Sequence, residues 1–177
     1  LGSAYHYWYS KLGKKRNPST SMDYQKGSLL GTEYSNQDIE NYLKDNDFPY
    51  MCHERKDLSK EIAKLLSKEN VIGWFNGKME FGPRALGSRS ILGDPRSPKM
   101  QKQMNLKIKF RESFRPFAPI VLAEKAKEWF NFKGKELQKQ FSSPYMLLVG
   151  EVNSSQVKLE TENKLNGFAR LDNINSL

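Results

Sequence analysis

Cysteine and histidine are scarce in this chain, whose 177 residues include one cysteine and two histidines. Cys52 has no second cysteine for an internal disulfide, so we expect a reducing compartment and predict a cytoplasmic location. No CxxC pair occurs, and with only two histidines we expect no metal site within this chain. Cys52 and His53 are neighbours, but adjacent side chains of an extended chain point to opposite faces, which argues against a catalytic pair.

Long apolar runs and nucleotide-binding glycine motifs are missing as well. No stretch approaches the roughly 18 apolar residues of a membrane span, and no signal-peptide pattern opens the chain, so we expect no membrane partner. Neither GxGxxG nor GxxxxGKS/T occurs, which disfavours dinucleotide-binding and P-loop proteins. The chain does not begin with methionine and ends without an obvious helix end, so we expect an internal piece of a longer protein.

Positive charge is concentrated in the middle of the chain. Residues 78–115 include ten basic and three acidic residues, a net charge of 10 − 3 = +7, against +9 for the whole chain. At the centre of this region is Met79–Ser90, with the sequence MEFGPRALGSRS. Glycines let a backbone approach a ligand closely, and arginines match the oxygens of phosphate or carboxylate. The sequence therefore predicts a local anionic partner.

Three interpretations of this charge remain open from the residues alone. The first is a polyphosphate site in which four arginines converge, helped by Ser90 and by the backbone N–H groups of Gly82 and Gly87. The second is a set of structural ion pairs with carboxylates. The third is a nucleic-acid surface, because aromatic residues alternate with the basic ones. The arginines are Arg84, Arg89, Arg111 and Arg115, the carboxylates Glu80, Asp94 and Glu112, and the aromatic residues Phe110, Phe114 and Phe117.

The hydrophobic pattern predicts helices and strands in alternation. A capping box at Ser35–Asp38 predicts a helix over residues 36–44. Further helices are expected from Asp57, from Ser97 as N-cap with a stripe of Met100, Met104 and Ile108, over residues 124–130, and at the start of the chain over residues 1–9. Asn70 is expected to end the helix from Asp57.

Strands are expected at residues 71–75 and 89–92, with Asn76-Gly77 as a two-residue hairpin turn after the first. Residues 117–122 are strand-like, 145–149 predict a buried strand, 134–143 a polar loop and 167–171 a last strand. These elements predict the α/β class with a mixed, twisted open sheet and flanking helices.

Two long segments carry a resemblance to a known family. GWFNGKMEFGPRALGSRSILGDPR, followed by NLKIKFRESFRPFAPIVL, closely resembles the C-terminal domain of the O-carbamoyltransferase family, which includes the nodulation, cephamycin and tobramycin carbamoyltransferases. The upstream LLGTEYSNQDIENYLKD also resembles its LGPEYSDEEIE segment, so the resemblance extends from about Gly27 to Leu171.

The resemblance implies a YrdC-like domain over residues 27–177, truncated at its end. Residues 1–26 would be the tail of a preceding ATPase-fold domain and a linker. The YrdC-like domain would form carbamoyl adenylate from ATP and carbamoyl phosphate with Mg²⁺. The preceding domain would bind iron and the acceptor whose hydroxyl receives the carbamoyl group. The resemblance leaves open a homodimer of the full-length protein, and the alternative is a basic RNA- or DNA-binding module without catalysis.

The site residues implied by the resemblance lie in the two segments quoted above and near the end of the chain. Arg84 and Arg89 would contact phosphate or carbamoyl oxygens, with Ser90 at the same anion. The catalytic set is Arg84, Arg89, Ser90 and Lys109, and the residues expected to bind ATP or carbamoyl phosphate are Met79, Phe81, Gly82, Gly87, Arg111, Arg115, Phe117 and Arg170. Phe168 stands where the family has threonine, which puts contacts beside Arg170 in doubt.

Overall fold

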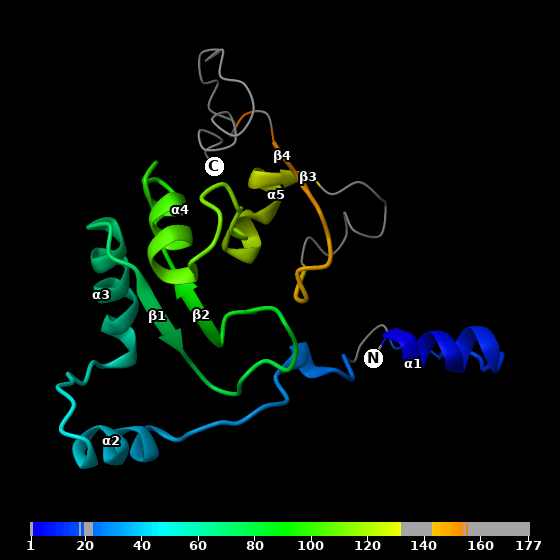
Figure 1. Cartoon of the computed structure of the whole chain (residues 1–177), viewed down its shortest axis with the longest axis horizontal. Coiled ribbons are helices and arrows are strands. Elements are labelled where there is room, and N and C mark those ends of the chain that lie inside the picture. Colours follow the sequence, from blue (N-terminus) through cyan, green and yellow to red (C-terminus); the bar gives the residue numbers. More distant parts are fainter. Residues whose placement is uncertain (1, 18, 20–22, 132–142, 154, 156–177) are drawn as a thin grey trace.

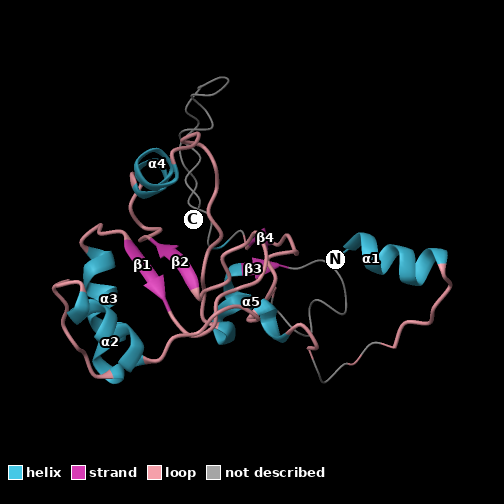
Figure 2. Ribbon diagram, turned by 60° about the horizontal axis from the view of Figure 1, so that its bottom comes forward, coloured by secondary structure: helices cyan, strands magenta, loops and turns pink. Residues whose placement is uncertain are grey.

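The computed structural model describes residues 2–17, 19, 23–131, 143–153 and 155 (Figure 1). Helices and short antiparallel sheets alternate along the chain, which confirms the α/β class (Figure 2). The YrdC-like mixed sheet stays a prediction, because the described strands form two antiparallel pairs. In the described residues, we find no helix with the length and apolarity that crossing a membrane would need.

The N-terminal helix stands apart from the other elements. α1 (Gly2–His6) continues into a π-helical turn at Tyr7–Lys11, so the helix expected over residues 1–9 is confirmed for its described part. Neither segment has a buried residue, and α1 projects away from the remaining helices in both ribbon views (Figures 1 and 2). Tyr5 and Tyr9 stack on each other within this segment.

α2 (Asn36–Asp45) begins with the expected capping box. The Ser35 hydroxyl accepts from the backbone N–H of Asp38 at 3.1 Å, and the Asp38 carboxylate accepts from the backbone N–H of Ser35 at 2.9 Å. These hydrogen bonds satisfy amide groups that a helix start otherwise leaves without partners.

We expect Ser35→Ala to destabilise α2 by about 1 kcal/mol, because it removes the acceptor of the Asp38 N–H. The measurement is the urea dependence of the far-ultraviolet circular dichroism. Ser67→Ala is the matched control, since it deletes a hydroxyl that donates to the Lys64 carbonyl at the end of a helix. An equal loss in both variants would contradict the capping explanation.

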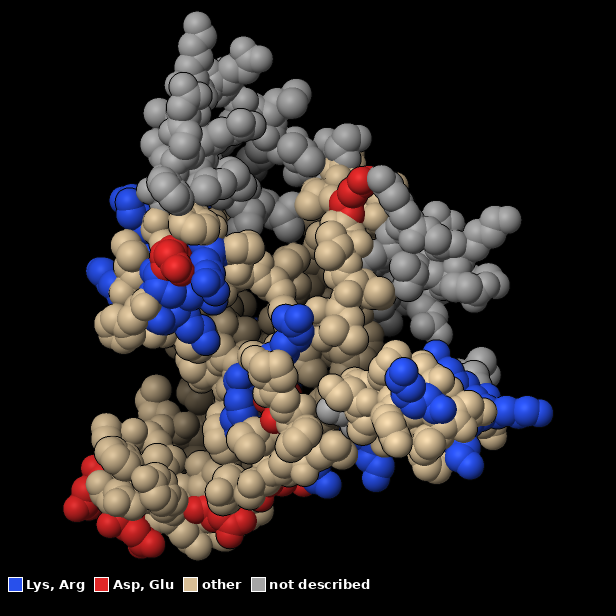
Figure 3. Space-filling view, turned by 45° about the vertical axis from the view of Figure 1, so that its right-hand side comes forward, with Lys and Arg blue, Asp and Glu red and all other residues tan. Residues whose placement is uncertain are grey.

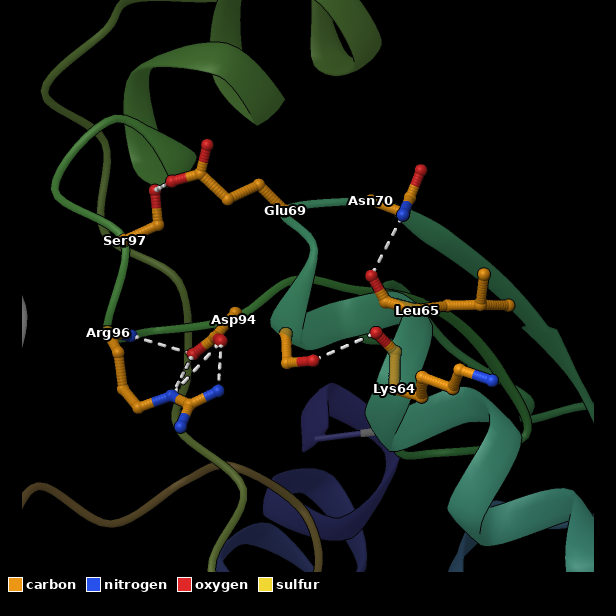
Figure 4. A network of polar contacts seen from close by, with 8 residues as sticks. Lys64, Leu65, Glu69, Asn70, Asp94, Arg96 and Ser97 are labelled. Carbon is orange, nitrogen blue, oxygen red and sulfur yellow. Dashed lines mark hydrogen bonds and ion pairs between the residues drawn. The ribbon is translucent and has the colours of Figure 1, made fainter.

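α3 (Arg55–Ser67) begins earlier than the sequence suggested. Its N-cap is Glu54, so Asp57 lies inside the first turn and the prediction that Asp57 caps this helix is wrong. The left-handed residue after the helix is Glu69 (φ 63°), not Asn70. Asn70 contributes instead through its side-chain amide, which donates to the Leu65 carbonyl at 2.9 Å (Figure 4).

β1 (Ile72–Phe75) and β2 (Arg89–Leu92) form the central antiparallel pair, with Ile72 opposite Leu92 and Phe75 opposite Arg89. Both predicted strands are confirmed. The prediction of a two-residue turn at Asn76-Gly77 is wrong. The Asn76 N–H donates to the Ser88 carbonyl at 2.9 Å and so continues the hydrogen bonding between the two strands. The chain bends at Gly77 (φ 58°) without reversing there, and the connection is a long loop.

The base of this long loop docks on residues 28–32. The Met79 N–H donates to the Thr32 carbonyl at 2.9 Å, and the Phe81 N–H donates to the Ser28 carbonyl at 2.7 Å. The Gly31 N–H donates to the Met79 carbonyl at 2.9 Å. A Cβ atom at Gly31 would lie 2.9 Å from the Cβ and the carbonyl oxygen of Met79, so the close approach requires glycine.

α4 (Met100–Gln103) continues into a π-helical turn at Met104–Lys109. Met100 and Met104 are each 4% exposed and pack on Gly93 after β2, which confirms them as core residues. Ile108 is 41% exposed, so its place in the predicted stripe is wrong. The change to π-helical winding rotates residues after Met104 away from the face that a regular α-helix would keep.

The turn between β2 and α4 is held by side chains (Figure 4). Ser97 is not the helix N-cap; its hydroxyl donates to the Glu69 carboxylate at 2.6 Å and ties the turn to the end of α3. Asp94 is 8% exposed and accepts from the Arg96 backbone at 2.9 Å and from its guanidinium at 2.6 Å.

The C-terminal part contains a 3₁₀ turn at Ala123–Lys125 and α5 (Ala126–Trp129), which confirm the expected short helix. β3 (Phe130–Asn131) pairs antiparallel with β4 (Glu151–Val152). Residues 117–122 belong to no strand of the described chain, and residues 145–149 are not a buried strand, since Val149 is 95% exposed. Most of the predicted loop at 134–143 and the strand at 167–171 lie outside the described residues.

Candidate functional site

The structure places the predicted site residues in two groups. We call residues 77–88, between β1 and β2, the arginine loop, and residues 109–117, after the π-helical turn, the basic segment. The loop carries Met79, Phe81, Gly82, Arg84 and Gly87, with Arg89 and Ser90 directly after it in β2; the segment carries Lys109, Arg111, Arg115 and Phe117. Arg170 lies outside the described residues.

Glu80 organises the arginine loop from inside. It is 8% exposed, and its Oε1 accepts three backbone hydrogen bonds, from Leu86 at 2.9 Å, Ser88 at 2.7 Å and Arg89 at 3.1 Å. Burial alone would raise the pKa of this carboxyl, but the backbone donors outweigh burial and lower the pKa of Glu80 to about 2. Glu80 was considered above as an ion-pair partner for an arginine, but its partners are backbone N–H groups.

This lowered pKa makes the free energy of unfolding depend on pH in the acid range. A carboxyl whose pKa falls on folding contributes stability that is complete above its ordinary value of 4.5 and is lost as the pH falls toward about 2. We expect the contribution to be on the order of 2 kcal/mol. Urea unfolding between pH 5 and pH 2.5 measures it, and Glu80→Gln should flatten the dependence. An unchanged slope in Glu80→Gln would contradict the assignment.

Arg89 uses its guanidinium on the protein itself. Nη1 donates to the carbonyls of Asn76 at 3.2 Å and Ser88 at 2.9 Å, and Nη2 donates to those of Thr32 at 3.3 Å and Gly77 at 3.0 Å. The guanidinium also lies 3.5 Å from the centre of the Phe75 ring. It thereby joins both ends of the arginine loop to the upstream segment. Its contact with a phosphate or carbamoyl oxygen stays a prediction.

Arg84 is the contrasting case. It is exposed, and its guanidinium makes no hydrogen bond or ion pair with any residue in the part of the chain that the structure describes. Gly82 (φ 133°) and Gly87 (φ 104°) flank it in backbone conformations that other residues rarely adopt. The Gly87 N–H donates to the Ser90 hydroxyl at 3.1 Å, so these two groups satisfy each other. Arg84 therefore presents its charge to solvent from an ordered loop.

Two more residues of the loop offer apolar surface. Met79 is 44% exposed and Phe81 is 70% exposed, although the backbone of both is held by residues 28–32. An exposed thioether and an exposed ring on fixed backbone fit the expected binding of ATP or carbamoyl phosphate by these two residues. That role stays a prediction.

The basic segment is built around a buried amide. Asn105 is fully buried; its Nδ2 donates to the carbonyls of Ser113 at 2.9 Å and Arg115 at 2.8 Å. Its Oδ1 accepts from Nε of Arg111 at 2.6 Å, and that guanidinium lies 4.8 Å from the centre of the Phe117 ring. The sequence analysis missed Asn105. A polar residue directly after the buried Met104 was the one available signal.

The charges of the basic segment are presented differently from one another. Lys109 is exposed and has no hydrogen bond or ion pair with a described residue. Arg115 pairs with Glu112 at 3.1 Å, but both side chains are 54% exposed, so the pair contributes little to stability. Structural ion pairs therefore account for part of the positive charge, that of Arg115 and Arg96, but not for that of Arg84 or Lys109.

Charge is distributed unevenly over the surface. In Figure 3, Lys and Arg gather around α4 with the turn that follows it and around α1, whereas acidic residues gather near α2. The basic residues beside α4 are Lys99, Lys102, Lys107 and Lys109, and the acidic residues around α2 are Glu33, Asp38, Glu40, Asp45 and Asp47. The basic side chains beside α4 thus belong to the positive region predicted for residues 78–115.

A family of transferase domains accounts for the loop and the basic segment together. The family described as Carbamoyltransferase C-terminus matches residues 63–176, which include both groups. The chain belongs to this family.

Relatives agree with the family assignment. The chain is 49% identical to an uncharacterized protein of Synechocystis sp. over 154 residues, 86% of this chain and 24% of that protein. It is 39% identical to Nodulation protein NolO of Bradyrhizobium diazoefficiens over 118 residues, 67% of this chain and 21% of that protein. It is 37% identical to Nodulation protein U of Rhizobium fredii over 133 residues, which are 75% of this chain and 22% of that protein. The chain therefore spans about a quarter or less of these relatives.

Proposed function

We propose that this chain is the part of an O-carbamoyltransferase that forms carbamoyl adenylate from ATP and carbamoyl phosphate. A preceding ATPase-fold domain would then transfer the carbamoyl group to an acceptor hydroxyl. The family supports carbamoyl transfer in general. The observation that carries the adenylating role is Arg84, an exposed cation without a described partner on a loop whose backbone is fastened at both ends.

Formation of carbamoyl adenylate requires mainly positive charge in fixed positions. Water cleaves carbamoyl phosphate to carbamate and phosphate. A carbamate oxygen then attacks the α-phosphorus of ATP, the bond to the β-phosphate oxygen breaks, and pyrophosphate leaves. Negative charge accumulates on the phosphoryl oxygens, which positioned cations stabilise. Among the described residues, Arg84 and Lys109 have no partner and so have free donors for those oxygens, and Arg111 keeps its Nη groups available while Asn105 holds its Nε.

Mg²⁺ fits this site through the nucleotide more than through the chain. The two buried carboxylates between residues 78 and 115 already accept hydrogen bonds, Glu80 from three backbone N–H groups and Asp94 from Arg96. Mg²⁺ bound to ATP keeps phosphate oxygens and waters as its ligands, and it would neutralise part of the triphosphate charge. The YrdC-like fold and an iron site in the preceding domain are part of the same proposal.

Calorimetric titration of the chain with ATP and Mg²⁺, with and without carbamoyl phosphate, tests the proposal. We expect saturable binding that Arg84→Ala weakens by about tenfold or more. Lys60→Ala, which removes a cation from the exposed face of α3, should leave this binding unchanged. Absence of binding in the chain and in the full-length protein would overturn the adenylating role.

The same titration separates the alternative, a basic nucleic-acid module. Binding of RNA or DNA through phosphate contacts weakens with salt by roughly one logarithmic unit of slope per contact. The site proposed here binds one nucleotide and depends on Arg84. Tight RNA binding with a steep salt slope that Arg84→Ala leaves unchanged would favour the alternative.

A further inference from the structure

The arginine loop owes its shape to one carboxylate oxygen. Backbone N–H groups of Leu86, Ser88 and Arg89 converge on Oε1 of Glu80, and the N–H between them, that of Gly87, is satisfied by Ser90. Successive N–H groups that converge in this way form a concavity suited to an anion. Glu80 fills it with an anion of the chain's own, so the backbone of residues 86–89 has no donor left for a ligand.

This arrangement fixes the position of Arg84. On one side, the Phe81 N–H donates to the Ser28 carbonyl at 2.7 Å; on the other, the Leu86 N–H donates to Glu80 at 2.9 Å. Between these two fastened points only residues 82–85 are left, Gly82-Pro83-Arg84-Ala85. Pro83 has a restricted φ, which removes further freedom directly before Arg84.

We propose that Glu80 is a positioning residue, which holds residues 86–89 so that Arg84 meets the phosphoryl oxygens of the bound nucleotide. The inference rests on the proposed function for its ligand. We assign Glu80 no contact with substrate, because it is 8% exposed and its Oε1 accepts from three backbone N–H groups. Its lowered pKa agrees with a carboxylate that stays ionised and holds no proton to transfer.

The proposal predicts coupling between Glu80 and Arg84. Glu80→Ala leaves three buried or half-buried N–H groups without their acceptor, and the loop then ceases to hold Arg84. If Glu80 acts through Arg84, Glu80→Ala and Arg84→Ala each weaken ATP binding by about tenfold or more, and the double variant binds no more weakly than the weaker single one. Glu80→Gln keeps an acceptor oxygen, so its binding should lie within a few-fold of the parent.

A matched control separates positioning from loss of stability. Asp94 is 8% exposed, as Glu80 is, and it also accepts a backbone hydrogen bond, together with hydrogen bonds from the Arg96 guanidinium. It lies beyond the opposite end of β2, in the turn before α4. Asp94→Ala should destabilise the fold, as measured by urea unfolding, and leave the Kd for ATP within about threefold of the parent.

The experiment is calorimetric titration of the chain with ATP and Mg²⁺. It compares the parent with the single variants Glu80→Ala, Arg84→Ala, Asp94→Ala and Glu80→Gln and with the Glu80→Ala/Arg84→Ala double variant. Effects of the two alanine substitutions that multiply in the double variant would overturn the positioning role, and so would an equal loss of binding in Asp94→Ala. Amide hydrogen exchange at Leu86, Ser88 and Arg89 gives a readout without nucleotide. Protection that disappears in Glu80→Ala and persists in Asp94→Ala is expected, and exchange in the parent as fast as in Glu80→Ala would overturn the proposal.

The two proposals fail in different ways. A parent that binds no ATP, with protected amides that depend on Glu80, removes the nucleotide role and leaves the loop-holding role standing. A parent that binds ATP through Arg84 without coupling to Glu80 keeps the nucleotide role and removes the positioning role.

Discussion

Arg84→Ala is expected to lower ATP-dependent pyrophosphate release by the full-length protein by about 10²- to 10³-fold, while the fold stays intact. The reason is that one preorganised donor to a developing oxyanion contributes roughly 2.7–4 kcal/mol to the transition state. The fold should be unaffected because the Arg84 side chain is exposed and has no partner in the described part of the chain.

Release of pyrophosphate in a coupled assay with carbamoyl phosphate measures this effect. Lys60→Ala serves as control for the loss of one positive charge, and Arg84→Lys tests whether the planar guanidinium is required. A rate within threefold of the parent in Arg84→Ala would refute the assigned role of this residue.

Asn105→Leu is expected to destabilise the protein by about 2–4 kcal/mol. The change removes the amide that donates to the carbonyls of Ser113 and Arg115 and that accepts from Arg111, and it leaves these groups without their partner. Asn105 is fully buried, so water cannot replace the lost hydrogen bonds without rearrangement.

Urea unfolding monitored by tryptophan fluorescence measures the loss. Gln101→Leu is the matched control, since Gln101 donates to the carbonyls of Phe114 and Arg115 at 3.2 Å from a less buried position. We expect that control to lose about 1 kcal/mol or less. Equal losses in the two variants would show that the burial of Asn105 adds nothing.

The elements that the sequence predicted well follow local rules. The capping box at Ser35 is complete because both of its hydrogen bonds join residues three positions apart. β1 and β2 were found from apolar runs of strand length, and Met100 and Met104 from helical spacing. In these cases the sequence neighbours carry enough information.

The features that the sequence missed depend on distant backbone. Asn76-Gly77 does not make a two-residue turn because the chain beyond it pairs with residues 28–32, far upstream. Glu80 and Asn105 act on backbone N–H and carbonyl groups, which leave no side-chain pattern to recognise. The ion-pair interpretation, one of the three left open, therefore offered the wrong kind of partner for Glu80.

The prediction of a buried strand at residues 145–149 was wrong for a different reason. An apolar run of this length fits a buried strand, but Tyr145 is drawn into a turn in which the Met146 N–H donates to the Ser143 carbonyl at 3.1 Å. The Tyr145 hydroxyl donates to Asp23 and accepts from the Gly27 N–H at 3.2 Å. These contacts join the turn to residues 23–27, directly before the stretch on which the arginine loop docks, and no hydrophobic pattern indicates them.

The docking of the arginine loop on residues 28–32 bears on the N-terminal boundary of the folded domain. The family match begins at residue 63, yet the acceptors for the Phe81 and Met79 N–H groups are the carbonyls of Ser28 and Thr32. A shortened gene product that starts at the family boundary would lack these acceptors and one of the four carbonyls that Arg89 binds. The smallest autonomous version of this domain thus has to include the Ser28–Thr32 stretch, which the family boundary at residue 63 would cut away.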